Sequence, residues 1–237
     1  MPTSAADHWA IVPAAGIGAR MGAERPKQYL PLAGRPLLLH TLDRLLAAPR
    51  VAGLVLTLRA DDPHWPALGF RADKPLHVVS GGACRAASVL AALDELARQL
   101  AADTPLLVHD AVRPLLHASD IERLCGQPLD AHGCLLAMPL TDTIKRADAG
   151  GRSEATVPRD GLWAAQTPQR FQLGVLRTAL RDALAAGSEP TDEAQAMERA
   201  GWRPRLVPGR RDNLKITVPQ DLPLAECLLA AQQCEDG

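Results

Sequence analysis

Residues 11–22, I-V-P-A-A-G-I-G-A-R-M-G, have the composition of a phosphate-binding loop and directly follow an expected strand. Gly16 and Gly18 permit backbone angles that other residues avoid, so consecutive N–H groups can point at phosphate oxygens. Ala14 and Ala15 are small enough to let a ligand approach the main chain. The pattern therefore predicts a loop that binds a phosphorylated ligand through its backbone.

Two cations extend this loop. Arg20 and Lys27 follow the glycines within about two helical turns, a spacing that suits a polyphosphate. Four of the 26 basic residues are lysines, so a lysine at position 27 indicates a need for a compact ammonium charge. We expect residues 14–21 to hold a nucleoside triphosphate while Arg20 and Lys27 act on its α-phosphate. A solvated basic face is the alternative interpretation.

Two other nucleotide-binding loops do not fit the spacing. The dinucleotide fingerprint G-x-G-x-x-G fails because its third position is Met21, and Gly22 comes one residue late. Its acidic ribose partner would be Asp43, which falls inside an expected helix and not at a strand end. A Walker A loop is excluded because no G-K-[ST] follows.

A carboxylate is expected on the same rim of the sheet. Asp110 follows a predicted strand at residues 105–109, and ligands of open parallel sheets bind outside the carboxyl ends of strands. A carboxylate beside a triphosphate suits Mg²⁺, whereas a helix N-cap is the alternative role for Asp110. His109 is expected to be structural. Gly82 and Ser88 follow another strand, at a turn that suits a base or ribose but is also ordinary strand-to-helix chemistry.

Short apolar runs alternate with segments of helical period, which is typical of βαβ units. Strands are expected at residues 9–12, 53–58, 76–79, 105–109, 133–139 and 204–207. Helices are expected at residues 36–48, 85–100, 173–186 and 219–232, from a capping box at Ser119 to Glu122, and after Thr191 and Asp192. The prediction is a Rossmann-like, doubly wound α/β fold with a mostly parallel sheet, in one domain of residues 1–237.

The regular alternation stops at residues 141–167, where polar residues, Gly150, Gly151 and Pro158 dominate. A stretch of this length inside a compact domain is usually a functional loop, a disordered segment or an arm that reaches a neighbour.

The composition disfavours several classes of protein. The formal net charge is -1 and aromatic residues make up 3%, so binding of nucleic acid is not expected. No apolar run approaches the roughly 18 residues of a membrane span, and the start shows no signal-peptide pattern. The five cysteines form no C-x-x-C pair, as in a reduced protein. We expect a cytoplasmic protein.

The motifs P-A-A-G-x-G-x-R-M, P-K-Q-Y, S-G-G, H-D-A-V-R-P, D-T-I-K-R, A-Q-T-P-Q, T-D-E-A and D-N-L-K-I-T occur in this order. With them the chain resembles the 2-C-methyl-D-erythritol 4-phosphate cytidylyltransferases from residue 10 to residue 226. The first motif alone indicates only the wider nucleotidyltransferase superfamily. The resemblance implies transfer of CMP from CTP to methylerythritol 4-phosphate with release of pyrophosphate, in the non-mevalonate route to isoprenoid precursors, with Mg²⁺ or another divalent cation.

The resemblance also implies roles for particular residues. Arg20, Lys27 and Lys215 would be catalytic and would stabilise the reacting phosphates. The nucleotide would contact Ala14, Ala15, Gly16, Gly82, Ser88 and Asp110, of which Asp110 would lie near the ribose and the metal. The methylerythritol phosphate would contact Arg113, Thr143, Arg159, Thr167 and Thr191.

In the resembled family, the stretch at about residues 141–167 is a β-arm that exchanges across a homodimer, so Arg159 would serve the partner's active site. Two positions depart from the family pattern. Ala83 stands where an acidic residue is common, which puts one nucleotide contact in doubt, and Val112 stands where alanine is common, beneath Arg113.

Three other functions stay open on the sequence alone. A cytidylyltransferase for another polyol phosphate, such as ribitol 5-phosphate, would share the loop and the lysines. An NAD-dependent oxidoreductase would need the fingerprint that fails here. A non-catalytic nucleotide sensor could keep the loop, although Arg20, Lys27, Asp110 and Lys215 together favour an enzyme.

Overall fold

A central sheet dominates the computed structural model, which describes residues 8–16 and 25–236. In spatial order its strands are β11 (Arg205–Pro208), β7 (Cys134–Pro139), β10 (Trp163–Gln172), β6 (Pro105–Val108), β1 (His8–Pro13), β4 (Val51–Leu58) and β5 (Leu76–Ser80). The strand β10 runs antiparallel to β6 and β7, whereas the other neighbouring strands are parallel. The predicted α/β fold with a mostly parallel sheet is confirmed.

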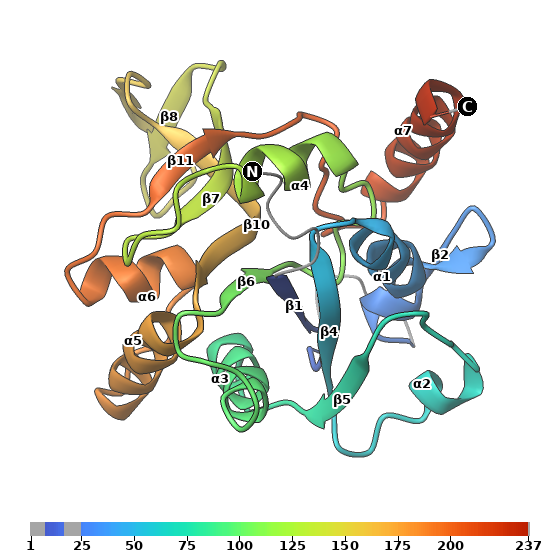
Figure 1. Cartoon of the computed structure of the whole chain (residues 1–237). Coiled ribbons are helices and arrows are strands. Elements are labelled where there is room, and N and C mark those ends of the chain that lie inside the picture. The colour runs from blue at the N-terminus through green and yellow to red at the C-terminus, as the bar shows by residue number, and fades with distance from the viewer. Residues whose placement is uncertain (1–7, 17–24, 237) are drawn as a thin grey trace.

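Helices cover both faces of this sheet (Figure 1). One face packs against α1 (Leu37–Ala47) and α4 (Ala118–Cys125), and the other packs against α3 (Arg85–Leu96), α5 (Leu173–Ala185) and α6 (Glu193–Arg199). The remaining helices are the 3₁₀ turn η2 (Lys27–Tyr29), the short α2 (His64–Ala67) and α7 (Asp221–Asp236). This is the doubly wound arrangement that the sequence predicted.

The central strand β1 shows why the chain forms this sandwich. Ala10, Ile11 and Val12 are all fully buried. Successive strand residues point to opposite faces, so Ala10 and Val12 join the core under α1 and α4, while Ile11 joins the core under α3 and α5. A continuous apolar run is therefore required of a strand that is covered on both faces.

A smaller core anchors the C-terminal part of the chain. Ile216 is fully buried against Leu32, Leu115 and the α7 residues Ala225 and Leu229. The loop between β11 and α7 is thereby fixed beside the ends of β1 and β6.

A β-hairpin stands away from the sheet between β7 and β10 (Figure 1). It consists of β8 (Ile144–Ala147) and β9 (Ser153–Val157), which pair antiparallel. The expected irregular stretch at 141–167 is thus a hairpin followed by the first part of β10, because residues 163–165 pair with β7 in the central sheet. Pro168 and the polar sequence concealed this strand, since proline interrupts a ladder and polar residues do not mark a buried strand.

Two helix starts were expected, the first of them from a capping box, and the N-cap expected there is wrong. At α4 the N-cap is His117, whose side chain accepts from the Ser119 N–H, so Ser119 lies inside the helix and does not cap it. At α6 the prediction is confirmed, because Asp192 caps the helix by accepting from the Gln195 N–H at 2.8 Å.

Candidate active site

The loop after β1 is fixed through its backbone. The Ala14 N–H donates to the Thr57 carbonyl at 2.8 Å, and the buried Gln28 amide donates to the Ala14 carbonyl at 2.7 Å. Both polar groups of this first loop residue are therefore used inside the protein. The described chain continues to Gly16 and resumes at residue 25, so Arg20 and the second half of the predicted loop lie outside the described residues.

A cavity of about 210 Å³, here called the glycine-loop cavity, opens beside this loop. Its lining comes from the ends of β1, β5 and β6, from η2 and from the C-terminal loop: Pro13, Ala14, Ala15, Gly16, Lys27, Gln28, Gly82, Ala83, Cys84, Arg85, Ser88, Asp110, Ala111, Val112 and Lys215. The structure thus brings together eight of the residues that the sequence analysis selected. Three cations and one carboxylate lie in this lining, which suits an anionic ligand.

The turn after β5 is built by a close approach of backbone to side chain. A Cβ on Gly81 would lie 2.5 Å from the Ala15 Cβ and 2.8 Å from the Ser88 Oγ, so only glycine fits. The Ser88 hydroxyl accepts from the Gly82 N–H at 3.1 Å and donates to the Cys84 carbonyl at 3.0 Å. Its single proton is therefore used within the turn, and in this arrangement the hydroxyl can offer a ligand only an acceptor.

Asp110 lies at the centre of a cluster of cations. Its carboxylate is 2.8 Å from the Lys215 ammonium, 3.1 Å from the Arg85 guanidinium and 3.6 Å from that of Arg113. Burial alone would raise the pKa of Asp110, but Arg85, Lys215 and Arg113 outweigh burial and hold this pKa far below its ordinary value. The carboxylate is thus charged. The N-cap alternative for Asp110 is wrong, because the next helix begins at Ala118.

Behind Asp110, a neutral histidine holds the threonine of β10. The fully buried His109 has Nε2 at 3.1 Å from the Arg113 carbonyl oxygen and Nδ1 at 2.9 Å from the Thr167 hydroxyl. A carbonyl can only accept, so Nε2 carries the proton and Nδ1 accepts from Thr167. Burial lowers the pKa of His109 to about 4, in agreement with this neutral form. The Thr167 oxygen in turn accepts from the Asp110 N–H.

A second cavity of about 140 Å³, here called the β10 cavity, adjoins the first. Its lining is Arg85, Asp110, Arg113, Ala165, Gln166, Thr167, Gln169, Thr191, Asp192 and Lys215. Arg85, Asp110 and Lys215 line both cavities and separate them. Of the residues expected to contact a second substrate, Arg113, Thr167 and Thr191 meet here.

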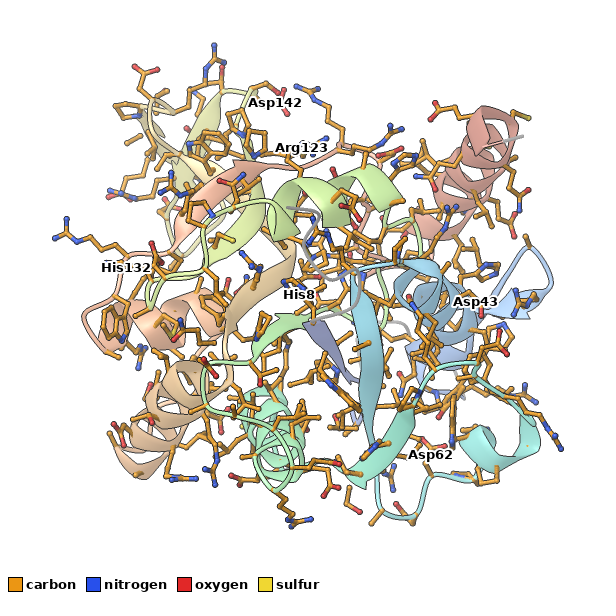
Figure 2. The ribbon with its side chains drawn as sticks, viewed as in Figure 1. His8, Asp43, Asp62, Arg123, His132 and Asp142 are labelled. Carbon is orange, nitrogen blue, oxygen red and sulfur yellow. The ribbon has the colours of Figure 1, made fainter. Side chains whose placement is uncertain are left out.

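Thr143 and Arg159 line neither cavity of the same chain. Arg159 lies in the connection after β9 and donates to the Thr141 carbonyl at the base of the hairpin. Asp43, the residue rejected as a ribose partner, lies on α1 (labelled in Figure 2), pairs with Arg35 at 2.9 Å and lines neither cavity.

Four residues around the cavities were not predicted from the sequence: Arg85, Gln28, Glu193 and Asn213. Arg85 bridges Asp110 and Glu193, while Asn213 donates to the Thr167 carbonyl at 2.8 Å and accepts at its own carbonyl from Arg113 at 2.7 Å. One signal for Arg85 was available, because it lies three residues after the S-G-G turn at the carboxyl end of a strand. Glu193 and Asn213 lie within the T-D-E-A and D-N-L-K-I-T motifs, but no role was assigned to them, because they reach the site through tertiary packing.

The donor set for a metal ion is small. Asp110 is the one carboxylate lining the glycine-loop cavity, and the part of the chain that the structure describes has no group of three or more His, Cys, Asp or Glu that could hold a metal. Mg²⁺ takes one or two carboxylates together with substrate phosphates. The residues therefore fit an ion that arrives with a polyphosphate, and not an ion held by the protein alone.

Within the described residues, no helix has both the length and the apolar character needed to cross a bilayer.

The fold and the two adjoining cationic cavities at the carboxyl ends of β1, β5 and β6 are those of a nucleotidyltransferase.

Comparison with known proteins gives the family. Residues 8–231 match the family model of 2-C-methyl-D-erythritol 4-phosphate cytidylyltransferase, and the chain belongs to this family. A relative of that name from Halorhodospira halophila is 54% identical, and the similarity covers 95% of this chain and 95% of the relative. A relative of the same name from Pseudomonas putida is 52% identical, and the similarity covers 90% of this chain and 92% of the relative. The chain is thus a cytidylyltransferase.

Solved structures agree. A crystal structure of 4-diphosphocytidyl-2C-methyl-D-erythritol synthase is 36% identical, with a TM-score of 0.80, and the similarity covers 94% of this chain and 98% of that one. The 2-C-methyl-D-erythritol 4-phosphate cytidylyltransferase of Francisella tularensis is 31% identical, with a TM-score of 0.80 over 94% and 99% of the two chains.

Proposed function

We propose that this cytidylyltransferase transfers CMP from CTP to 2-C-methyl-D-erythritol 4-phosphate, giving 4-diphosphocytidyl-2-C-methylerythritol and pyrophosphate. The reaction belongs to the non-mevalonate route to isoprenoid precursors, the role that the family assignment carries. The observation that supports it best is the pair of cavities that share Arg85, Asp110 and Lys215. Two anionic substrates that must react with each other need two sites that meet at cations.

CTP is proposed to occupy the glycine-loop cavity. The loop backbone from Ala14 to Gly16 and the turn at Gly82 offer close approach to the main chain, and Lys27 lines the same cavity. Arg20 is proposed to complete the phosphate site from the part of the loop outside the described residues. Because Ser88 and the Gly82 N–H are bonded to each other, Ser88 is proposed to shape the base site and to accept a hydrogen bond from the nucleotide.

The acceptor is proposed to occupy the β10 cavity, with its phosphate directed at the shared cations. A phosphate oxygen of the acceptor forms a bond to the α-phosphorus of CTP, and the bond from that phosphorus to the β-phosphate oxygen breaks, so pyrophosphate leaves. A phosphomonoester is largely a dianion near neutral pH, because its second pKa is about 6, so no strong base is required. Rate then depends on alignment and on cations placed where negative charge develops.

Lys27 and Lys215 are proposed to supply those cations, together with Arg20. Lys215 lies at the junction of both cavities, where it can contact the acceptor phosphate and the α-phosphate together. Arg113, Thr167 and Thr191 are proposed to hold the polyol phosphate. Asp110 is proposed to hold Mg²⁺ that enters with CTP, and this ion would neutralise charge on the triphosphate.

We further propose that residues 1–237 form a single nucleotidyltransferase domain that works as a homodimer, with the arm at about 141–167 reaching a partner. Thr143 and Arg159 lie in this arm and line neither cavity of their own chain, which supports a role in the partner's acceptor site. CTP as substrate favours the cytoplasm as the compartment. No contact with nucleic acid or membrane is proposed.

The decisive experiment measures pyrophosphate release from CTP and Mg²⁺ with different acceptors. We expect turnover with 2-C-methyl-D-erythritol 4-phosphate and kcat/KM at least about tenfold lower with ribitol 5-phosphate, because site groups left unpaired by the wrong acceptor cost binding free energy. Equal efficiency with both acceptors would contradict the assigned substrate. CTP binding without turnover of any acceptor would instead favour a nucleotide sensor.

A further inference from the structure

The cation cluster between the two cavities continues to a carboxylate that lines neither of them, Glu193. We infer that Arg85 and Glu193 are positioning residues that orient Asp110 and, through it, Lys215 at the junction of the glycine-loop cavity and the β10 cavity. The inference rests on the proposed function, because it concerns the alignment of the two substrates.

Glu193 is held rigidly at one end of the series of ion pairs that leads through Arg85 to Asp110. It is fully buried, and its two oxygens accept from the two terminal nitrogens of Arg85 at 2.6 and 3.1 Å. It is the first residue of α6, where the helix N-terminus favours a carboxylate. The start of α6 is tied to β10, since the Gln169 side chain accepts from the Ala194 N–H at 2.8 Å and donates to Asp192 at 2.9 Å.

Arg85 connects Glu193 to Asp110, and few of its N–H groups remain free to bind a ligand. Besides Glu193, it donates to the Asp110 Oδ1 from Nε at 3.3 Å and from a terminal nitrogen at 3.1 Å. Four of the five N–H groups of a guanidinium are thereby used. Arg85 is also the first residue of α3, where the helix dipole disfavours a cation, so the helix itself gives no reason for arginine there. The two carboxylates give that reason.

The orientation of Asp110 follows from these contacts. Arg85 binds Oδ1, which leaves Oδ2 facing Lys215 at 2.8 Å and Arg113 at 3.6 Å. The Lys215 side chain is 40% exposed, and a lysine on its flexible stem has many rotamers open to it unless a partner selects one. Glu193 and Arg85 therefore fix the position of the ammonium by fixing the carboxylate that holds it.

An ordinary structural role explains the arrangement less well. A buried ion pair costs much of its attraction in desolvation, and apolar residues of similar size often stabilise a core as well or better. Here the arginine of the pair lines both cavities, and its contacts lead through Asp110 to a lysine that also lines both. Its geometry serves the site more directly than it serves the core.

The first test is Glu193→Gln, which keeps the side-chain size and removes the charge. We expect kcat to fall about ten- to hundredfold, since displacement of a reacting group by about 1 Å has a cost of this order. The KM for CTP should change far less, because the glycine-loop backbone is untouched. Asp94→Asn is the matched control: it removes a carboxylate of α3 that pairs with Arg177 of α5 at 2.6 Å and lines neither cavity.

The second test is a double-mutant cycle with Lys215→Ala, measured as single turnovers with excess enzyme. Because Glu193 is inferred to act through Lys215, Glu193→Gln should slow the Lys215→Ala enzyme by less than about threefold, whereas independent effects would multiply. Multiplying losses, or an unchanged kcat in Glu193→Gln alone, would overturn the inference. Wild-type enzyme that fails to turn over methylerythritol phosphate would instead reject the proposed function.

A third variant covers the case that Glu193→Gln does not fold, as judged by circular dichroism. Arg85→Lys keeps the charge, but one ammonium cannot replace a fork that binds two carboxylates at once. We expect the same loss of kcat with a folded protein. A kcat like that of the wild type in folded Arg85→Lys would contradict the role of Arg85.

Discussion

His109 is a buried titratable group that the site keeps neutral. Its ring is enclosed between the Arg113 carbonyl and the Thr167 hydroxyl, and protonation of Nδ1 would reverse the second hydrogen bond and take its acceptor from the Thr167 proton. Burial is the main reason that its pKa falls from 6.5 to about 4. The histidine thus supports Thr167 and the Asp110 backbone, and it is not proposed as an acid or base.

A pH dependence of stability follows from this pKa. The unfolded chain protonates His109 near pH 6.5 and the folded chain only near pH 4, so the contribution of His109 is complete above pH 6.5 and is lost as the pH falls toward 4. We expect it to fall by about 2 kcal/mol between pH 7 and pH 5. Urea unfolding at both pH values should show this loss in the wild type and not in His109→Asn. The same loss in the variant would assign it to other groups.

Residues with a charge next to a strand end were predictable, and residues recruited by tertiary packing were not. Lys27 and Asp110 were selected because they follow glycines or a strand, and both line the glycine-loop cavity. Lys215 was selected only through its resemblance motif. Glu193 escaped notice because a glutamate at a helix start is ordinary sequence, and its meaning depends on Arg85, which lies 108 residues earlier.

Among the elements, the contact between the loop after β1 and the turn after β5 shapes one wall of the glycine-loop cavity, where the base of CTP is proposed to bind. We expect Gly81→Ala to raise the Kd for CTP about tenfold, since the added Cβ would collide with Ala15 and Ser88, and overpacking of this kind costs about 1–3 kcal/mol. Titration calorimetry with CTP measures the change. Gly150→Ala is the control, because its nearest neighbour would be an ordinary contact at 3.4 Å. An unchanged Kd in Gly81→Ala would show that the turn adjusts freely.

Strands and helices with a regular apolar period were predicted within a few residues of their observed bounds, as β1 and α5 illustrate. The strand β10 was not. Its buried residues include Gln166, Thr167, Gln169 and Arg170, whose polar groups bond to the Arg210 carbonyl, His109, Asp192 and His8. Burial of polar groups is tolerated only with such partners, and a single sequence does not reveal partners that are distant along the chain.

At the scale of the whole molecule, the hairpin leaves the sheet at the rim that carries both cavities, because β7 ends and β10 begins there, with Trp163 opposite Pro139. An arm attached at this rim is well placed to serve a neighbouring active site. Its exposed strands bury little surface within their own chain. The proposed dimer would provide the missing contacts.

Subunit mixing tests this proposal. Lys27→Ala removes a cation of the proposed nucleotide site and Arg159→Ala removes a proposed contact to the acceptor, and each should lower kcat/KM by about 10²-fold or more. If Arg159 serves the partner's site, a mixed dimer has one site that lacks both groups and one that lacks neither. Co-refolded equal amounts should therefore recover roughly a quarter of wild-type activity, given random two-fold pairing. The control is the same measurement on the two variants refolded separately and mixed without subunit exchange. If the co-refolded sample recovers no activity, Arg159 serves the site of its own subunit.

The order in which the chain is synthesised gives the long-range contacts at Asp110 a further consequence. The strands β1, β4 and β5 and the loop that lines the glycine-loop cavity all precede residue 111, whereas Glu193, Asn213 and Lys215 come near the end. Chains emerge N-terminus first, and contacts between distant residues form late. A nascent or truncated chain can thus acquire the parallel half of its sheet while its charged centre is incomplete. A chain can therefore become catalytically active only after it has been translated almost to its last helix.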